Sequence, residues 1–131
     1  MARCKKEDNA DNMADTGYTK VQDSGKREEF PTGSVRDTRV GKGRFDLISP
    51  IALKRLAQHY ENGAVKYGER NWEKGQKLSR YLDSAMRHLN DFSGGCRKED
   101  HLSAVAWNVF ALIHTEEMAS KGKLPKELDD L

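Results

Sequence analysis

The sequence has few of the features that mark secreted or membrane proteins. It holds only two cysteines, Cys4 in a polar stretch and Cys96 beside two glycines, and these form neither a disulfide framework nor a CxxC metal pattern. No apolar run approaches the roughly 18 residues that a membrane span needs, and the N-terminus lacks the apolar core of a signal peptide. These absences predict a soluble, cytoplasmic protein with no membrane partner.

Charge of one sign is not in excess either. The chain has 23 lysines and arginines against 21 aspartates and glutamates, a formal net charge of +2. Dedicated nucleic-acid binders usually carry a stronger and more clustered positive excess, so we expect no nucleic-acid partner. Signatures of covalent catalysis are also missing, since no Ser/His/Asp or Cys/His arrangement and no Rossmann glycine pattern stands out.

What the chain does contain divides it into three predicted segments. Residues 1–29 are almost free of large apolar side chains and show no helical or strand period, which predicts a disordered or loosely attached tail. Residues 30–122 predict one folded helical domain. Residues 123–131 form a short C-terminal tail, for which we expect no more than a turn.

The domain opens with turn residues and basic side chains over residues 30–47. Gly41 and Gly43 flank Lys42 and permit a close approach of the backbone to a ligand, and Arg44 follows. This is not a Walker A loop, because Gly43 stands where that motif has Ser or Thr. Lys42 and Arg44 are therefore candidate phosphate contacts, and the alternative is a basic surface loop.

Helical periodicity and boundary residues then predict three helices. A capping serine before a proline begins the first, a capping serine begins the second, and two acidic residues that suit the helix dipole begin the third. Glycines end all three. The predicted ranges are Ser49–Gly68, Ser79–Phe92 and Glu99–Gly122. The positions expected to be buried in the first two helices are Leu53, Leu56, Ala57, Tyr60, Ala64 and Tyr67, and Leu82, Ala85, Met86, Leu89 and Phe92.

The third helix determines the predicted architecture. Its segment LSAVAWNVFALI is apolar nearly all the way round, so other helices must surround it. Three helices over roughly 75 residues make a small core that a single chain stabilises only marginally. We therefore predict an all-α fold, a small helical bundle completed by self-association into a dimer or tetramer.

Two polar residues interrupt this apolar helix on one side. His101 and Asn108 lie seven positions apart, and buried polar groups need partners. His88, at the edge of the buried face of the second helix, can approach His101 across the helix pair. These residues form either a functional site or a structural hydrogen-bond link between the two helices.

Carboxylates and cations gather near the same helices. Hard cations such as Mg²⁺ and Mn²⁺ prefer oxygen ligands, and helix bundles hold metals with carboxylates from facing helices. Lysine, arginine and tryptophan can contact phosphates or a base. The carboxylates are Glu61, Asp83, Asp91, Glu99 and Asp100, and the second group is Lys66, Arg70, Asn71, Trp72, Arg80 and Arg87.

Three motifs carry a family resemblance. GAVKYGERNWEKG, SRYLDSAMRHL and EDHLSAVAWN resemble the phage-encoded dATP/dGTP diphosphohydrolases, a family similar to the MazG-like, all-α nucleoside triphosphate pyrophosphohydrolases. The resemblance covers residues 32–118. It implies hydrolysis of dGTP or dATP to the monophosphate and pyrophosphate with Mg²⁺ or Mn²⁺. It also implies a role in remodelling the nucleotide pool, in the host cytoplasm if the protein is phage-encoded.

Given the activity that the resemblance implies, we expect roles for particular residues from the chemistry and position of their side chains. Asp83, Glu99 and Asp100 are the expected metal carboxylates, with Glu61 a further candidate. Asp83, His88, Asp100 and His101 are the expected catalytic group, the histidines acting as ligands or as partners of ligands. The expected substrate contacts are Lys42, Arg44, Lys66, Arg70, Asn71, Trp72, Arg80, Arg87 and Asn108.

The chain departs from the familiar MazG pattern, which places ExxE on one helix and ExxD on the next. Its second helix has Asp83 but no ExxE, and its third begins with EDHLSA. MazG metal ligands therefore do not transfer position by position. The departure also supports an alternative function, that of a non-catalytic helical module that binds a nucleotide or a protein.

Overall fold

The computed structural model describes Val21 and residues 23–131. The chain divides into two compact units, Met1–Phe45 and Asp46–Leu131. Most of the segment predicted to be a tail lies outside the described residues. Its described part includes a strand that begins at Arg27, before the predicted boundary at residue 30.

The N-terminal unit contains a β-hairpin. Strand β1 (Arg27–Glu29) pairs antiparallel with β2 (Val35–Asp37), so that Arg27 lies opposite Asp37. Gly33 takes a φ of 84° in the turn between them, a conformation that glycine adopts without steric cost. These strands are an addition to the predicted all-α fold, which the other described elements follow. A short 3₁₀ turn, η1 (Phe45–Leu47), comes next.

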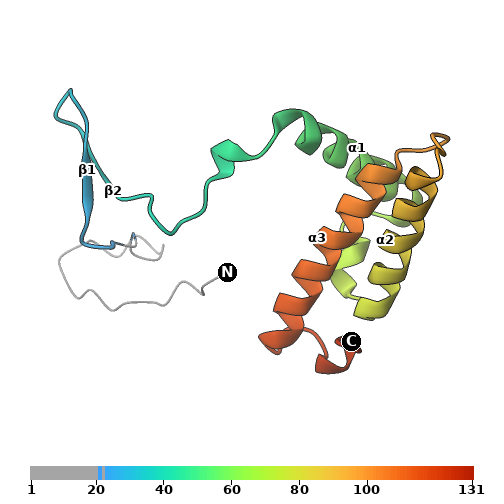
Figure 1. The fold of residues 1–131 in the computed structure, drawn as a ribbon. Coiled ribbons are helices and arrows are strands. Elements are labelled where there is room, and N and C mark those ends of the chain that lie inside the picture. The colour runs from blue at the N-terminus through green and yellow to red at the C-terminus, as the bar shows by residue number, and fades with distance from the viewer. Residues whose placement is uncertain (1–20, 22) are drawn as a thin grey trace. The chain divides into compact units, whose positions relative to one another are not determined.

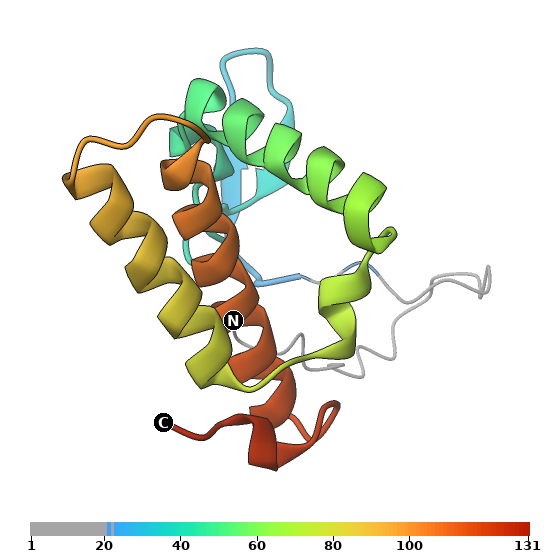
Figure 2. The same ribbon diagram turned by 90° about the vertical axis from the view of Figure 1, so that its right-hand side faces the viewer.

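The C-terminal unit is the predicted small all-α domain. Its helices are α1 (Pro50–Tyr67), α2 (Leu78–Ser93) and α3 (His101–Ser120), with 3₁₀ turns η2 (Asn71–Lys74) and η3 (Lys126–Leu128). Figures 1 and 2 show α2 and α3 running antiparallel side by side, with α1 crossing near the start of α3. The expected turn in the C-terminal tail is η3. Within the described residues, no helix combines the length and apolarity needed to cross a membrane.

The predicted starts of α1 and α3 are confirmed, and the predicted start of α2 is wrong. The Ser49 hydroxyl accepts from the Ala52 amide at 3.2 Å, and the Asp100 carboxylate accepts from the Ser103 amide at 3.1 Å. Helix α2 begins instead after Lys77, whose side chain makes no capping bond. Ser79 lies inside the first turn of α2.

Asp130 supplies the missing cap of α2 from the far end of the chain. Its carboxylate accepts from the Ser79 amide at 2.9 Å and from the Ser79 hydroxyl at 2.5 Å. The polar residue that satisfies the first turn of α2 is therefore remote in sequence, and local capping rules place the helix start at the wrong residue.

The core lies between α2 and α3. Leu78, Tyr81 and Ala85 of α2 are buried, and small residues of α3 let the two helices approach closely. The buried residues of α3 include Ala104, Ala111 and Ala119.

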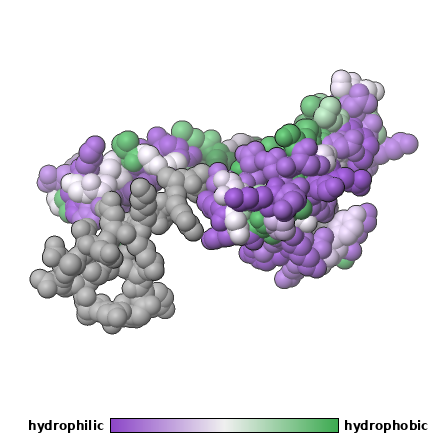
Figure 3. All heavy atoms as spheres, turned by 90° about the horizontal axis from the view of Figure 1, so that it is seen from below, coloured by the Kyte–Doolittle hydropathy of each residue, from purple (hydrophilic) through white to green (hydrophobic). Residues whose placement is uncertain are grey.

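The predicted buried faces of α1 and α2 were both wrong in part. In α1, Leu53, Ala57 and Tyr67 are exposed. Leu82, Met86 and Leu89 are exposed, and so are Val109, Phe110 and Ile113 of α3. Helical periodicity identifies an apolar stripe, but it does not show whether the same chain supplies the surface that covers it. Hydrophobic patches reach the surface between hydrophilic side chains on the face drawn in Figure 3.

Candidate functional site

A pocket of about 1080 Å³ opens in the helical unit. Its walls are the C-terminal half of α1, the connector Gly68–Gln76, and the facing sides of α2 and α3. In Figure 2, α1 diverges from α3, and the connector returns the chain to the start of α2. Its volume lies at the upper end of the usual range for small-molecule sites.

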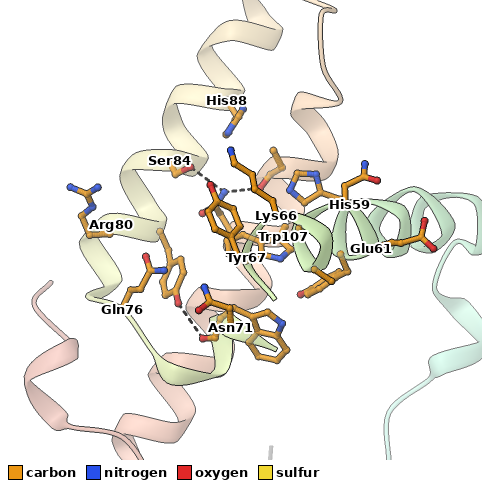
Figure 4. Close-up of a pocket in the computed structure, with 18 of the residues that line it drawn as sticks. His59, Glu61, Lys66, Tyr67, Asn71, Gln76, Arg80, Ser84, His88 and Trp107 are labelled. Carbon is orange, nitrogen blue, oxygen red and sulfur yellow. Dashed lines mark hydrogen bonds between the residues drawn. The ribbon is translucent and has the colours of Figure 1, made fainter. Parts of the chain in front are cut away.

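The pocket collects the four predicted cationic contacts of the helical unit. Lys66, Arg70, Arg80 and Arg87 all line it, as does Asn71. In Figure 4 the Lys66 ammonium and the His88 ring point toward the same space between α1 and α2. A hydrogen bond with Tyr67 raises the pKa of Lys66, which keeps this group charged. Carboxylates line the same cavity, so it offers partners both for an anionic ligand and for a cation. They are Glu61, Glu69, Asp83, Asp91 and Glu99.

Aromatic rings form another wall. Trp72 lies edge-on to Tyr60 with ring centroids 6.1 Å apart, and to His114 at 4.9 Å. Trp107 packs against Tyr60 at 6.3 Å and Tyr81 at 6.1 Å. Trp72 is therefore both anchored to the helices and part of the pocket lining, where a flat base can contact it.

Asn108 of α3 links this helix to α2. It is 4% exposed, and its amide donates to the Ala104 carbonyl at 2.8 Å and to the Ser84 hydroxyl at 3.3 Å. The structural hydrogen bond considered from the sequence is thus present. Asn108 also lines the pocket, so its predicted contact with substrate stays a prediction.

At the α2–α3 end, two imidazoles and one carboxylate converge. His88 Nδ1 and His101 Nδ1 are 3.0 Å apart, which confirms the predicted approach of the two histidines. Glu99 Oε1 lies 3.1 Å from His88 Nδ1 and 3.4 Å from His101 Nδ1. Imidazole nitrogens and carboxylate oxygens bind divalent metals, and this donor set can hold one ion. We call these three residues the His–Glu–His group.

Cys96 adds a contact that sequence reasoning missed. Its Sγ lies 3.2 Å from His101 Nε2, the ring nitrogen that faces away from the other two members of the group. The sequence places Cys96 only in a glycine-rich loop. Its spacing from His101 carries no known motif, so no sequence signal indicated the contact.

Asp100 lies apart from the His–Glu–His group although it is adjacent in sequence. Its carboxylate accepts from Arg55 Nε at 2.9 Å and Nη2 at 2.5 Å, and from the Ser103 hydroxyl at 2.7 Å. The hydrogen bond from Arg55 holds the pKa of Asp100 well below its usual range. This carboxylate caps α3 and ties it to α1.

The other two predicted metal carboxylates line the pocket without a histidine partner. The Asp83 side chain is 77% exposed and lies 3.8 Å from Arg87. Glu61 accepts a hydrogen bond from Gln58 at 2.7 Å. Their predicted role in metal binding stays a prediction.

Two predicted phosphate contacts belong to the N-terminal unit. Lys42 Nζ pairs with Asp37 at 2.7 Å, and this bond lowers the pKa of Asp37 to about 2. Arg44 lies two residues further along. Contact of either residue with substrate also stays a prediction.

One known protein family matches most of the chain. The sequence model of a family described as "dATP/dGTP diphosphohydrolase, N-terminal" matches residues 32–124. The chain belongs to this family. The match confirms the resemblance inferred from the three motifs, and it spans all three α-helices and every residue that lines the pocket. No curated protein sequence matches the chain, and no solved structure does.

Proposed function

We propose that this diphosphohydrolase-family chain hydrolyses purine deoxynucleoside triphosphates, dGTP or dATP or both, to the monophosphate and pyrophosphate. The observation that carries the proposal is the composition of one pocket. Cationic side chains and aromatic walls meet there with His88 and Glu99, two of the three residues of a donor set suited to a divalent metal. A triphosphate, a base and a cation are the three parts of a metal–nucleotide substrate.

The cationic side chains serve the phosphates in this proposal. Lys66, Arg80 and Arg87 neutralise the triphosphate and stabilise the charge that builds on the pyrophosphate as it leaves. Trp72 and Tyr60 provide flat apolar surface for the purine. A divalent cation such as Mg²⁺ or Mn²⁺, when bound, supplies further positive charge and lowers the pKa of a coordinated water.

The reaction itself needs no covalent enzyme intermediate. Water attacks the α-phosphorus and gives up a proton to the solvent. The bond between the α-phosphorus and the oxygen that bridges to the β-phosphorus breaks, and pyrophosphate leaves with the electron pair. The residues of the pocket bind and orient the substrate for this step, which is the larger part of catalysis in phosphoryl transfer.

We also propose that the chain is active as a dimer or tetramer and that it remodels the nucleotide pool of a phage. The exposed apolar side chains of α2 and α3 support self-association, because a helix face of this kind is stabilised when another surface covers it. Light scattering at micromolar concentration should give a mass at least twice that of the chain, and a stable monomer would contradict this part.

Product analysis tests the activity. The purified chain is incubated with each deoxynucleoside triphosphate and with Mg²⁺, Mn²⁺ or EDTA, and the products are separated by anion exchange. We expect dGMP or dAMP together with pyrophosphate, only when metal is present. Release of a nucleoside diphosphate, or no turnover, would overturn the proposal.

The same experiment separates the alternative, a non-catalytic binding module. The pairing of Asp100 with Arg55 favours that alternative, because it leaves one predicted metal carboxylate engaged. Nucleotide binding measured by calorimetry without any turnover would establish it.

A further inference from the structure

We propose that His88, Glu99 and His101 form a preformed site for one transition-metal ion, selective for Mn²⁺ or Zn²⁺ over Mg²⁺. The inference goes beyond the proposed function, since binding of metal by these residues does not require hydrolysis of a nucleotide. It rests on the spacing of the three donor atoms, on how they are held, and on their chemistry.

The spacing matches one face of a coordination polyhedron. The three donor atoms are 3.0, 3.1 and 3.4 Å apart. With metal–ligand bonds of about 2.0–2.2 Å, neighbouring ligands lie about 3.0 Å apart in an octahedron and about 3.4 Å apart in a tetrahedron. One ion therefore fits against this face with little movement of the side chains.

The packing holds the two imidazoles in this arrangement. His101 is the first residue of α3 and is 4% exposed, and His88 lies on α2 with 17% of its side chain exposed. Asp100, between Glu99 and His101, is fixed by Arg55 and by the Ser103 amide. The two imidazoles are therefore placed by folding rather than by the ion, and the exposed Glu99 completes the donor set beside them.

Cys96 offers a hydrogen-bond partner to the second ring nitrogen of His101. The contact between His101 Nε2 and Cys96 Sγ is 3.2 Å, and a proton on Nε2 can be donated to the sulfur there. The proton on Nε2 leaves a lone pair on Nδ1, which faces His88 and Glu99. Metal-binding histidines commonly donate their second nitrogen in this way, which fixes the ring and its tautomer.

The donor set determines which ions are preferred. Imidazole suits Zn²⁺ and similar transition ions, and a set that mixes imidazole with a carboxylate also offers Mn²⁺ the oxygen ligand that it takes. Mg²⁺ takes oxygen ligands and gives up water reluctantly. Three protein ligands leave coordination positions open. His88 and Glu99 also line the large pocket, so those positions are accessible to a ligand bound in it.

Metal titration of the full chain tests the site. After treatment with EDTA and its removal, the chain is titrated with Mn²⁺, Zn²⁺ and Mg²⁺ by calorimetry, and with Co²⁺ by visible absorption. We expect one Mn²⁺ or Zn²⁺ per chain, with at least tenfold weaker binding of Mg²⁺. Equal affinity for Mg²⁺, or no bound ion, would overturn the proposal.

Variants assign the site to its residues. His88→Ala, His101→Ala and Glu99→Gln should each weaken Mn²⁺ binding by about a hundredfold, and Cys96→Ala by about tenfold, as loss of an outer partner typically does. His114→Gln, a histidine of α3 outside the group, should leave binding unchanged. Because Glu99 is exposed, Glu99→Gln decides the matter if the buried His101→Ala fails to fold. Unchanged binding in a folded Glu99→Gln chain would refute the site.

The outcomes also separate this inference from the proposed function. A chain that binds Mn²⁺ at these residues without hydrolysing any nucleotide supports the site and overturns only the function. A chain that hydrolyses dGTP with Mg²⁺ and shows no binding at these residues overturns only the site.

Discussion

The two ends of the pocket are built in different ways. At the α2–α3 end, the imidazoles of His88 and His101 are largely buried and their ring nitrogens meet at 3.0 Å. At the connector end, the cations are long exposed side chains, with the Arg70 side chain 74% exposed. We call these two regions the histidine end and the cationic end. The imidazoles of the histidine end are preorganised, whereas the side chains of the cationic end must become ordered when an anion binds.

This difference sets the size of the effects that we expect. Each long side chain loses rotamer entropy on binding, about 2 kcal/mol at most for lysine or arginine, which offsets part of the attraction it provides. A buried imidazole has lost that entropy during folding. Single changes at the histidine end should therefore cost more activity than single changes at the cationic end.

The largest effect is expected for Glu99→Gln. The change keeps the shape of the side chain but removes the negative charge from the His–Glu–His group, so turnover of dGTP at subsaturating Mn²⁺ should fall about a hundredfold, as for other electrostatic catalytic groups. Glu116→Gln, an exposed carboxylate of α3 outside the pocket, is the matched control and should keep full turnover. If Glu99→Gln lost less activity than Lys66→Ala, the cationic end would contribute more to turnover than the histidine end.

A smaller effect is expected for Lys66→Ala. Removing one exposed cation weakens phosphate binding, so KM for dGTP should rise about tenfold, equivalent to roughly 1.4 kcal/mol, while kcat changes less. Lys54→Ala changes a lysine of α1 that does not line the pocket, and its KM should match the parent. An equal fall of kcat and kcat/KM would mean that Lys66 acts in the transition state, which would make this end as specialised as the other.

The sequence allowed part of the histidine end to be predicted. His88 and His101 stood out because each is polar on the buried side of its helix, and helical spacing brings them together. Asp100 was a metal candidate because acidic residues at a helix start suit both a metal and a cap. Only the position of Arg55, 45 residues away, shows which partner the carboxylate has.

The cationic end could be predicted only as a group. Composition and helix order indicated that Lys66, Arg70, Arg80 and Arg87 lie near one another, and the pocket confirms their proximity. The sequence also did not show which face of α2 packs on α3. Leu82 and Met86 are apolar but exposed, because within one chain α1 alone does not cover the outer faces of α2 and α3.

The third effect concerns the support of the histidine end. Asp100→Ala removes the cap of α3 and should lower the free energy of unfolding by about 1 kcal/mol, within the usual range for helix caps. The pKa of Asp100 is below its usual range in the folded chain, so its contribution is present above the unfolded pKa, near pH 4, and is lost as the pH falls. Thermal melts of the two proteins should therefore differ at pH 7, and the difference should begin to shrink below about pH 4 without vanishing at pH 3, because the folded-state pKa lies well below that pH.

Asp100→Asn distinguishes the cap from a metal ligand. Asparagine also caps helices well but lacks the negative charge that pairs with Arg55, so this variant should melt between the parent and Asp100→Ala and keep most of its turnover. If it stays folded but loses turnover about a hundredfold, Asp100 is a catalytic carboxylate. The histidine end would then include a second acidic group.

The smallest effect is expected for Asp130→Ala, which tests whether the cationic end is as loosely held as its exposed side chains suggest. Asp130 caps α2 directly after the connector, through the amide and the hydroxyl of Ser79. The same C-terminal segment packs closely on the connector, since a Cβ on Gly75 would lie 2.9 Å from a methyl of Leu128. Asp130 is exposed, so water can replace much of what its carboxylate provides.

We therefore expect Asp130→Ala to lower the melting temperature by less than Asp100→Ala does and to raise KM for dGTP by no more than about twofold, since the cap positions the connector without contacting the pocket. Asp129→Ala, whose carboxylate contacts only the chain terminus among the described residues, is the control and should resemble the parent in both measurements. A rise in KM as large as that of Lys66→Ala would show that the C-terminal segment holds the connector in its binding conformation. The cationic end would then be preorganised too, by a segment that lies beyond the part of the chain shared with the family.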